Sequence, residues 1–311
     1  MLVIRNTEHF RIETYSIVTI GTFDGVHLGH QKILARLNEI KEKTGLKTVV
    51  LTFDPHPRKV LFPEQKDLRL LTTIDEKLEL FEKYKVDIAV VYPFTNHFSQ
   101  LDSDFYVNEI LCKNLKVKYL VIGYDHRFGK NRTGDIDTLK EISKNNAFII
   151  EEISAKDIDS IFVSSSKIRK ALEEGDVTLA RDYLGYNYFL KGTIIKGKQL
   201  GRTIGYPTAN LKINDSEKMI PRIGVYFVNL IIDNQTHYGM LNIGINPTTD
   251  QGNELKIEVH IFNFNQEVYG KSVEMSFFKR LRDEEKFSNL TELKRALKKD
   301  EEDCIKLMEI Y

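Results

Sequence analysis

The segment Gly21–His30 (G-T-F-D-G-V-H-L-G-H) constrains this chain more than any other, because it marks a change from strand to helix. The residues from Tyr15 to Ile20 are apolar and β-branched, and apolar residues recur at helical spacing after Leu28. The pattern predicts a strand, a glycine-rich loop and a helix whose first turn carries His27 and His30 on one face. Glycines that admit close backbone approach, and the positive end of a helix dipole, suit a phosphate group. The segment therefore predicts a nucleotide site.

Two other interpretations of this segment stay open. A glycine turn followed by two surface histidines would need no ligand. A metal ion held by Asp24, His27 and His30 is also possible, but the segment lacks the cysteines or the H-E-x-x-H pattern of a typical zinc site.

The composition limits the class of partner. The 311 residues suggest two domains, and a hydrophobic fraction of 41% is enough for folded cores. Lys plus Arg and Asp plus Glu both number 45, so the formal net charge is zero. A basic surface for nucleic acid is therefore not expected, and the predicted partners are small molecules. The sequence makes no prediction about protein partners.

The cysteines and the N-terminus indicate a compartment. Cys112 and Cys304 are far apart and fit no metal or redox spacing, which favours a reducing environment without disulfides. The first ten residues lack the apolar run of a signal peptide, and no apolar stretch is long enough to span a bilayer. We expect a cytoplasmic protein with no membrane segment.

Hydrophobic periodicity predicts two domains of different class. Up to about residue 150, apolar strands alternate with amphipathic helices, which is typical of parallel βαβ units. The predicted strands are 15–20, 47–53, 86–92, 117–123 and 148–153. The predicted helices are one from Leu28 onward, 73–84 with a capping box, 102–115, 135–145 and 164–184 with a break at Gly175.

Beyond residue 187 the period changes to two, with strands such as 224–232 and 256–263 separated by Gly, Asn and Pro turns. We therefore predict an α/β domain over residues 1–184 and an antiparallel β domain over residues 185–311. A closing helix over 290–311 carries many charges, and its charged run is interpreted as a solvated face.

Three further stretches of the first domain suit a nucleotide. His56 and Arg58 follow the second predicted strand, and the stretch from Gly123 to Gly129 follows a later one. Ligands of open parallel sheets bind beyond the carboxyl ends of strands, although a proline turn and a glycine turn explain these two stretches about as well. The third stretch, Ser164 to Arg169, places hydroxyls and a guanidinium at a helix start, where ordinary N-capping is the alternative.

The second domain carries its own signal. Glycines are dense between Gly192 and Gly205, which suits backbone wrapping of a phosphate tail, although glycine-rich β turns are the usual reason for such density. Thr208 and Asn210 lie at alternate positions of an extended segment, so they project to one side and offer oxygens to Mg²⁺ carried by ATP.

A predicted strand of the second domain exposes two polar residues. In the run K-I-E-V-H-I over 256–261, Glu258 and His260 emerge opposite the apolar residues. Simple solvent exposure is the alternative explanation, and His260 has no role that the sequence supports.

The first domain resembles the adenylyltransferase module of the bacterial bifunctional riboflavin kinase/FAD synthetases, a Rossmann-like nucleotidyltransferase fold with an H-x-G-H signature. Four motifs occur in family order: the H-x-G-H loop, a P-H-P loop, G-[FY]-[DN]-x-x-F-G and S-S-[ST]-x-I-R. This chain has Asp125 where some members have asparagine, and Ser166 where threonine is common. The resemblance implies catalytic His27 and His30, and an ATP/FMN site made of Gly21, Phe23, Asp24, Gly29, His56, Arg58, Asp125, Ser164, Ser165, Ser166 and Arg169.

The second domain resembles the riboflavin kinase fold, a β-barrel with a G-R-x-x-G-[YF]-P-T-A-N motif. The family's E-[VT]-H, R-[DP]-E-x-x-F and N-x-G-x-x-P-[TS] patterns also occur, the last around Gly244 to Thr248. The resemblance implies Glu258 as the catalytic base and Thr208 and Asn210 as metal ligands. It implies an ATP and flavin site made of Gly192, Gly197, Arg202, Gly205, Pro207, Thr208, Asn210, Arg282, Glu284 and Phe287.

The resemblance implies a bifunctional enzyme that phosphorylates riboflavin to FMN and then adenylylates FMN to FAD. Its expected ligands are ATP, Mg²⁺, riboflavin, FMN and FAD, with no tightly bound prosthetic group. Three alternatives remain: a nucleotidyltransferase with another acceptor such as pantetheine phosphate or a nicotinate nucleotide, a second domain that binds flavin without kinase activity, and an RNA-binding protein. The intact G-R-T-I-G-Y-P-T-A-N segment argues against the first, and neutral charge argues against the last.

Overall fold

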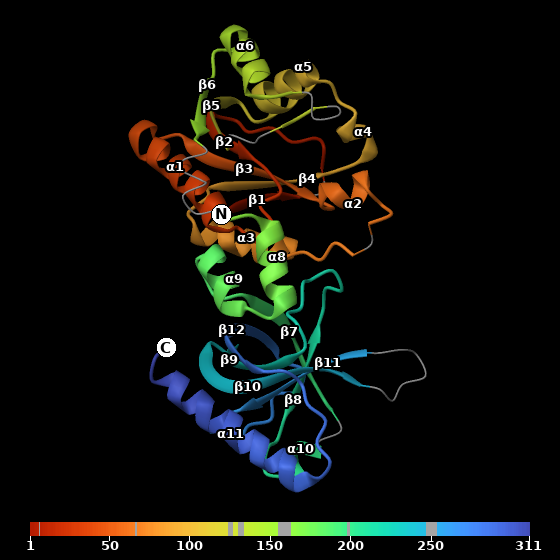
Figure 1. Cartoon of the computed structure of the whole chain (residues 1–311). Helices are drawn as coiled ribbons and strands as arrows, with labels where there is room; N and C mark the ends of the chain where they lie inside the picture. The colour runs from red at the N-terminus through yellow and green to blue at the C-terminus, as the bar shows by residue number, and fades with distance from the viewer. Residues whose placement is uncertain are drawn as a thin grey trace. The chain divides into compact units, whose positions relative to one another are not determined.

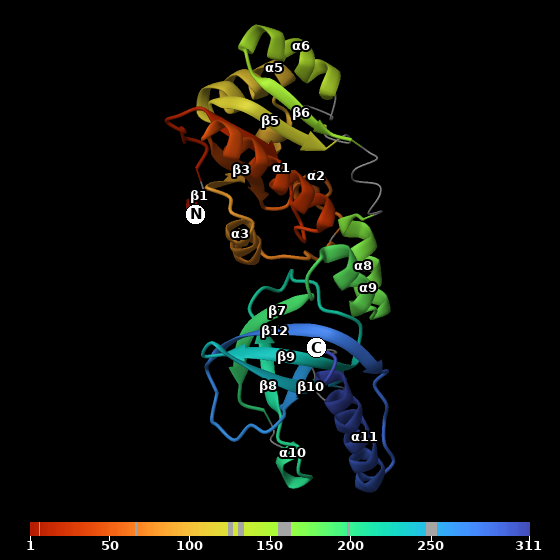
Figure 2. The same cartoon turned by 90° about the vertical axis from the view of Figure 1, so that its left-hand side faces the viewer.

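The computed structural model of the chain describes residues 1–5, 7–65, 67–123, 127–129, 134–154, 163–197, 200–246 and 254–311. Within it the chain forms two compact units, Met1–Ser165 and Ser166–Tyr311. The first contains a sheet with helices and the second contains a barrel (Figures 1 and 2). The predicted order of an α/β fold followed by an antiparallel β fold is confirmed.

The first unit is built on a parallel sheet of six strands. Its strands are β1 (Leu2–Arg5), β2 (Ser16–Ile20), β3 (Lys47–Asp54), β4 (Ile88–Pro93), β5 (Val117–Gly123) and β6 (Ile149–Ile153). They lie in the order β1-β4-β3-β2-β5-β6, and every neighbouring pair is parallel. All strands except β1 were expected from the sequence, and β1 is a short strand that is only partly buried.

The position of β2 determines where a site can form. It lies between β3 and β5, and every one of its residues is buried. Because the three strands are parallel, the loops that follow them leave the sheet at the same edge. The H-x-G-H loop and the P-H-P loop are therefore neighbours, and β5 ends at the same edge of the sheet.

Helices cover the sheet of the first unit (Figure 2). They are α1 (Leu28–Thr44), α2 (Pro57–Leu61), α3 (Ile74–Lys83), α4 (Asn96–Ser99), α5 (Ser103–Phe105), the π-helix η1 (Tyr106–Asn114) and α6 (Ile136–Asn146). The predicted capping box is confirmed: Thr73 N donates to Glu76 Oε2 over 2.9 Å, and Glu76 N donates to Thr73 Oγ1 over 3.3 Å. The helix predicted over 102–115 corresponds to α5 followed directly by η1.

The second unit is a closed antiparallel barrel. Its strands are β7 (Phe189–Ile195), β8 (Ala209–Ile213), β9 (Gly224–Ile232), β10 (Gln235–Asn246), β11 (Glu254–Ile261) and β12 (Ser272–Arg282), in the order β10-β11-β8-β7-β12-β9. Its helices are α8 (Ser165–Glu174), α9 (Val177–Leu184), α10 (Leu200–Thr203) and α11 (Leu290–Met308). The predicted break between α8 and α9 is confirmed, since Gly175 has a φ of 82°, a conformation that favours glycine.

Two helices that precede residue 185 belong to the second unit. Arg222 N donates to the Leu172 carbonyl over 2.9 Å, and α9 packs against β12 with Val177, Ala180 and Leu184 buried. The boundary at residue 185 between two functional domains stays a prediction.

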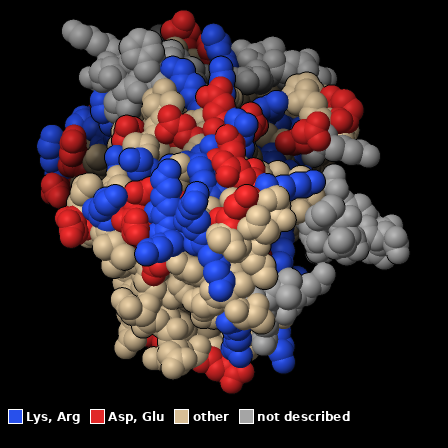
Figure 3. All heavy atoms as spheres, turned by 60° about the horizontal axis from the view of Figure 1, so that its bottom comes forward, with Lys and Arg blue, Asp and Glu red and all other residues tan. Residues whose placement is uncertain are grey.

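The surface charges of the described residues are mixed, as the zero net charge of the sequence predicts. Basic and acidic side chains lie among one another on the face shown in Figure 3. Within the described part of the chain, no helix is both long enough and apolar enough to cross a membrane.

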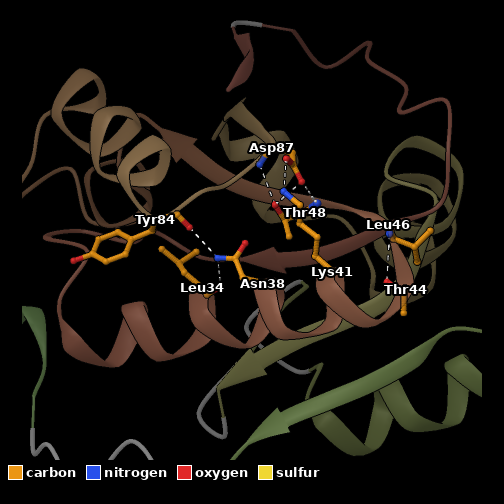
Figure 4. Close-up of polar contacts among 8 residues, drawn as sticks. All are labelled: Leu34, Asn38, Lys41, Thr44, Leu46, Thr48, Tyr84 and Asp87. Carbon is orange, nitrogen blue, oxygen red and sulfur yellow. Dashed lines mark hydrogen bonds and ion pairs between the residues drawn. The ribbon is translucent and has the colours of Figure 1, made fainter.

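A partly buried polar network holds the C-terminal half of α1 against the sheet (Figure 4). Asp87, just before β4, accepts from Lys41 Nζ over 2.6 Å and from the backbone N of Thr48 over 2.9 Å. Asn38 donates to the Tyr84 carbonyl over 2.9 Å, which connects α1 to the end of α3. These bonds fix the axis of the helix whose other end carries the histidines.

We expect Asp87→Asn to lower the free energy of unfolding of the first unit by about 1 to 3 kcal/mol. Burial alone would raise the pKa of Asp87, but the bonds from Lys41 and Thr48 outweigh it and hold the pKa below its usual value. The contribution of the ionised carboxylate is thus present above the unfolded pKa of about 3.9 and is lost as the pH falls through the lower folded pKa.

Urea unfolding at neutral and acid pH measures this difference. The matched control is Asp75→Asn, because Asp75 pairs with Arg5 at the surface, where ion pairs contribute little. Equal losses for the two variants would contradict the account.

Candidate active sites

The H-x-G-H loop between β2 and α1 has an unusual backbone. Phe23, Gly25 and Val26 all have positive φ values, of 48°, 83° and 37°. Only glycine adopts such values without strain, so the two apolar residues need outside support. Both are buried in the core, with exposed fractions of 1% for Phe23 and 0% for Val26. Packing and hydrogen bonds together therefore hold this loop in one conformation.

Asp24 supplies the hydrogen bonds that hold the loop. Its Oδ1 accepts from the backbone N of Leu71 over 3.0 Å and of Thr72 over 3.1 Å, and only 1% of the residue is exposed. Gly25 N donates in return to Thr72 Oγ1 over 3.0 Å. A carboxylate bonded to backbone N–H groups at the start of α3 joins that helix to the loop.

The two histidines stack on each other at the start of α1. Their ring centroids lie 3.7 Å apart at an angle of 17°, and His30 also lies 4.9 Å from the ring of Phe23. Both Nδ1 atoms are buried and have no hydrogen-bond partner among the described residues. Parallel rings in contact do not direct their nitrogens at one common ion, and Asp24 is bonded to the backbone. The geometry thus disfavours the metal interpretation, and no cluster of three His, Cys, Asp or Glu residues able to hold a metal occurs in the described ranges.

Burial keeps both histidines uncharged at neutral pH. It lowers the pKa of His27 to about 4, although the nearby Asp24 carboxylate acts in the opposite direction. The pKa of His30 is lowered well below its usual value by burial, by His27 and by the ammonium of Lys77. The pair therefore offers neutral imidazoles, which can donate or accept a hydrogen bond without carrying charge.

The serine stretch approaches the same loop through one residue. Ser165 Oγ donates to the Asp24 carbonyl over 2.9 Å, across 141 positions of sequence. Ser164 lies directly before α8, while Ser166 and Arg169 lie on α8 and belong to the second unit.

The other predicted nucleotide residues lie on neighbouring loops. His56 caps α2, with its Nδ1 accepting from Arg58 N over 3.2 Å, and Arg58 Nη2 donates to Gln65 over 2.9 Å. Gly21 N donates to the Leu51 carbonyl over 3.1 Å, and Gly29 is buried in α1. Asp125 lies outside the described residues.

Strand pairing assembles the predicted kinase residues of the second unit. Asn210 on β8 is the register partner of Glu258 on β11, and Thr208 Oγ1 lies 3.5 Å from Glu258 Oε1. Glu258 also pairs with Lys256 Nζ at 2.8 Å. The alternation predicted for β11 is confirmed, because Ile257, Val259 and Ile261 are buried. A hydroxyl, an amide and a carboxylate thus meet on one face of the barrel.

The glycine-rich segment packs closely against this group. A Cβ added at Gly197 would lie 2.0 Å from Asn210 Nδ2, so a larger residue there would displace the Asn210 side chain. Pro207 presents its carbonyl to His260 Nδ1 at 2.8 Å, which makes the ring a donor and gives His260 a structural role that the sequence did not suggest. The other predicted members are Gly192 on β7, Arg202 on α10 and Gly205 after it.

The stretch from Arg282 to Phe287 contacts α11 and β10. Arg282 forms a two-pronged ion pair with Asp300, through Nε to Oδ1 at 3.0 Å and Nη2 to Oδ2 at 2.8 Å, and lies 5.7 Å from the ring centroid of Phe287. Asp300 is only 4% exposed, so the interpretation of the α11 charges as a solvated face is wrong at this residue. The Glu284 carboxylate lies against Gly244, where an added Cβ would be 2.1 Å from Oε1.

Two family models match the chain in order. The model described as FAD synthetase matches residues 10–167, and the model described as riboflavin kinase matches residues 184–308. A bifunctional riboflavin kinase/FMN adenylyltransferase of Listeria monocytogenes is 39% identical over 287 residues, covering 92% of this chain and 90% of that protein. The chain belongs to the family of bifunctional riboflavin kinase/FMN adenylyltransferases. The resemblance predicted from the sequence is confirmed.

Other members of the family also match this chain over nearly its whole length. The protein of Bacillus subtilis is 37% identical over 295 residues, covering 94% of this chain and 92% of its own. The protein of Escherichia coli K12 is 34% identical over 286 residues, covering 92% and 90%. A crystal structure from Streptococcus pneumoniae, described as a macrolide-efflux protein, has a TM-score of 0.88 and 31% identity, covering 97% of this chain and 98% of that one.

Two residues close to the predicted site residues were not singled out in the sequence. Lys77 on α3 is only 5% exposed, and it lies among Ile74, Leu78 and Phe81 at helical spacing. A lysine on an apolar stripe was the available signal. Asn242 is the register partner of Glu258 on β10, and it begins the N-x-G-x-x-P-[TS] pattern that was noted only from Gly244 onward.

The lowered pKa of His27 predicts a loss of stability in mild acid. Its unfolded pKa is about 6.5 and its folded pKa about 4, so the unfolded state binds the proton first. The free energy of unfolding of the first unit should therefore fall as the pH drops from about 6.5 toward 4, by roughly 2 to 3 kcal/mol for this one group.

Urea unfolding at pH steps across that window, for the wild type and for His27→Gln, measures the difference. The glutamine variant should lose less stability over the same steps, because it cannot take up the proton. Identical pH dependence in both proteins would show that His27 titrates normally in the folded state.

Proposed function

We infer that the two units carry out consecutive ATP-dependent steps, riboflavin to FMN in the second and FMN to FAD in the first. The observation that carries this inference is that each unit assembles its own set of motif residues. His27, His30 and Ser165 meet at the loop after β2, whereas Thr208, Asn210 and Glu258 meet on the barrel.

In the adenylyl transfer, a terminal phosphate oxygen of FMN attacks the α-phosphorus of ATP, and pyrophosphate leaves. The reaction needs no protein nucleophile, since the demand is to orient the two phosphates and stabilise their charge. We propose that His27 and His30 donate hydrogen bonds to these phosphates as neutral imidazoles. The N-terminus of α1 adds backbone N–H groups and its dipole.

We propose further residues for this site. We propose that the backbone of the loop and the hydroxyls of the serine stretch bind the phosphates, and that the two loops after β3 and β5 bind the rest of ATP and FMN. The residues proposed for these contacts are Gly21, Phe23, Asp24, Gly29, His56, Arg58, Asp125, Ser164, Ser165, Ser166 and Arg169. The contacts of Asp24 with Leu71 and Thr72 support a role for its side chain in holding the loop.

In the kinase step, the ribityl 5′-hydroxyl of riboflavin attacks the γ-phosphorus of ATP, and ADP leaves. We propose that Glu258 accepts the proton of that hydroxyl. The carboxylate already has Lys256 and Thr208 as neighbours, and these contacts fix its direction. It is about a quarter exposed, with 23% of its side chain accessible, so a substrate can reach it.

The oxygens near Glu258 fit a magnesium ion. Mg²⁺ takes hard oxygen ligands and is held with the phosphates of its nucleotide, and Thr208 and Asn210 offer a hydroxyl and an amide oxygen there. We propose that these two residues hold the ion, whose charge would offset that of the transferred phosphate. Gly192, Gly197, Arg202, Gly205 and Pro207 would bind ATP, and Arg282, Glu284 and Phe287 the flavin.

The proposed partners are small molecules: ATP, riboflavin, FMN and FAD. A cytoplasmic location, the absence of nucleic-acid partners and a kinase domain that begins at residue 185 also remain proposals.

The boundary is tested by expressing residues 185–311 and residues 166–311, since the longer fragment keeps α8 and α9. Riboflavin phosphorylation by the shorter fragment would support a boundary at residue 185. If only the longer fragment were active, the kinase domain would have to begin before residue 185.

We expect Glu258→Gln to slow riboflavin phosphorylation by about a hundredfold to ten-thousandfold, the usual contribution of a general base. The glutamine keeps the size and the hydrogen-bonding reach of the side chain but cannot accept the proton. Initial rates of FMN formation from riboflavin and of FAD formation from FMN are measured on the same preparation. The second rate is the internal control and should not change.

The matched control variant is Glu274→Gln, because Glu274 on β12 pairs with Lys191 Nζ at 3.3 Å much as Glu258 pairs with Lys256. It should retain the wild-type kinase rate. If Glu258→Gln also retained it, positioning by Thr208, Asn210 and the metal ion would have to supply the catalysis.

A further inference from the structure

A buried lysine lies beneath the H-x-G-H loop, at a position that no motif of either half includes. Lys77 comes from α3, and only 5% of it is exposed. Its Nζ lies 3.5 Å from Thr52 Oγ1 at the end of β3, and that hydroxyl donates to the Thr22 carbonyl over 3.1 Å. A polar connection thus runs from α3 through β3 into the loop that carries the histidines.

The surroundings make this position costly for a charge. Leu78, Leu80 and Phe81 of the same helix are buried, and taking an ammonium out of water costs several kcal/mol unless it is compensated. Burial lowers the pKa of Lys77, while the carboxylates of Asp24 and Asp54 act against this and favour the ammonium. A leucine or methionine would fill the same space at a lower cost, so packing alone does not account for a lysine.

The charges around Lys77 come from each element that packs on it. Asp24 belongs to the loop, Asp54 ends β3, and the uncharged pair of His27 and His30 begins α1. Because both histidines are neutral, they bring no positive charge to a site that must receive the phosphates of two substrates. Lys77 is the lysine beside them, and a positive charge there also lowers the pKa of His30.

We propose that Lys77 is a positioning residue of the adenylyl transfer, whose buried side chain holds the Thr52–Thr22 connection in place and brings a fixed positive charge close to His27 and His30. The proposal rests on the role proposed above for His27 and His30. Lys77 need not touch a substrate. It acts through the loop, where a fixed charge in a low-dielectric site needs no reorganisation as charge develops on the phosphates.

The test compares Lys77→Met, Lys77→Arg and the matched control Lys83→Met in the full-length chain. Methionine keeps the length without the charge, arginine keeps the charge, and Lys83 lies on the same helix but is exposed. Four quantities are measured: the rate of FAD formation from FMN, the rate of FMN formation from riboflavin, the urea unfolding midpoint of the first unit, and the titration of His27 and His30 by NMR.

For Lys77→Met we expect FAD formation to slow by about tenfold to a hundredfold, less than for the loss of a donor that touches the reacting phosphate. The pKa of His30 should rise, because a nearby positive charge is gone. The unfolding midpoint should stay the same or increase, and FMN formation should not change. Lys77→Arg should keep the low histidine pKa and more of the FAD activity than methionine does, and Lys83→Met should match the wild type throughout.

Three results would overturn the proposal. One is wild-type FAD formation by Lys77→Met with unchanged histidine titration. Another is an equal loss for methionine and arginine with a lowered midpoint, which would show that the lysine only packs. The third is a shifted histidine titration without loss of FAD formation, which would locate the error in the proposed role of the histidines. If Lys77→Met fails to fold, Lys77→Arg decides between the alternatives by the same titration and rate.

Discussion

The first site depends on the hydrogen bonds that the buried Asp24 carboxylate accepts. It joins the loop after β2 to the start of α3 through two backbone N–H groups, and Ser165 binds the carbonyl of the same residue. Without these bonds, the positive φ values of Phe23 and Val26 would have little to sustain them. The stacked histidines follow directly from this loop, because α1 begins where it ends.

The second site depends on strand register instead of a strained loop. The pairing of Asn210 with Glu258, and of Glu258 with Asn242, places oxygen-bearing side chains from three neighbouring strands on one face. A slip of one residue would turn Glu258 into the core. In the function proposed above, the two units would thus handle ATP phosphates with different elements: a helix start in the first and a barrel wall in the second.

Sequence periodicity predicted most strands and helices, because burial of β2 and β11 leaves a direct trace in their residues. Local motifs such as the Thr73–Glu76 capping box and the break at Gly175 were also predictable. The stacking of His27 on His30, the charge of Lys77 under the loop and the ion pair between Arg282 and Asp300 were not. Each depends on which elements meet in space, and Asp300 in particular looked like one charge among many on an exposed helix.

The central claim, that two independent sites act in sequence, is tested most directly by mixing two defective proteins. His27→Ala should convert riboflavin to FMN but not to FAD, and Glu258→Gln should convert supplied FMN to FAD but phosphorylate riboflavin slowly. Together, with riboflavin, ATP and Mg²⁺, they should restore FAD formation, because FMN made by one is used by the other. If the mixture forms no more FAD than Glu258→Gln alone, or if His27→Ala also loses FMN formation while folded, the assignment of separate sites is contradicted.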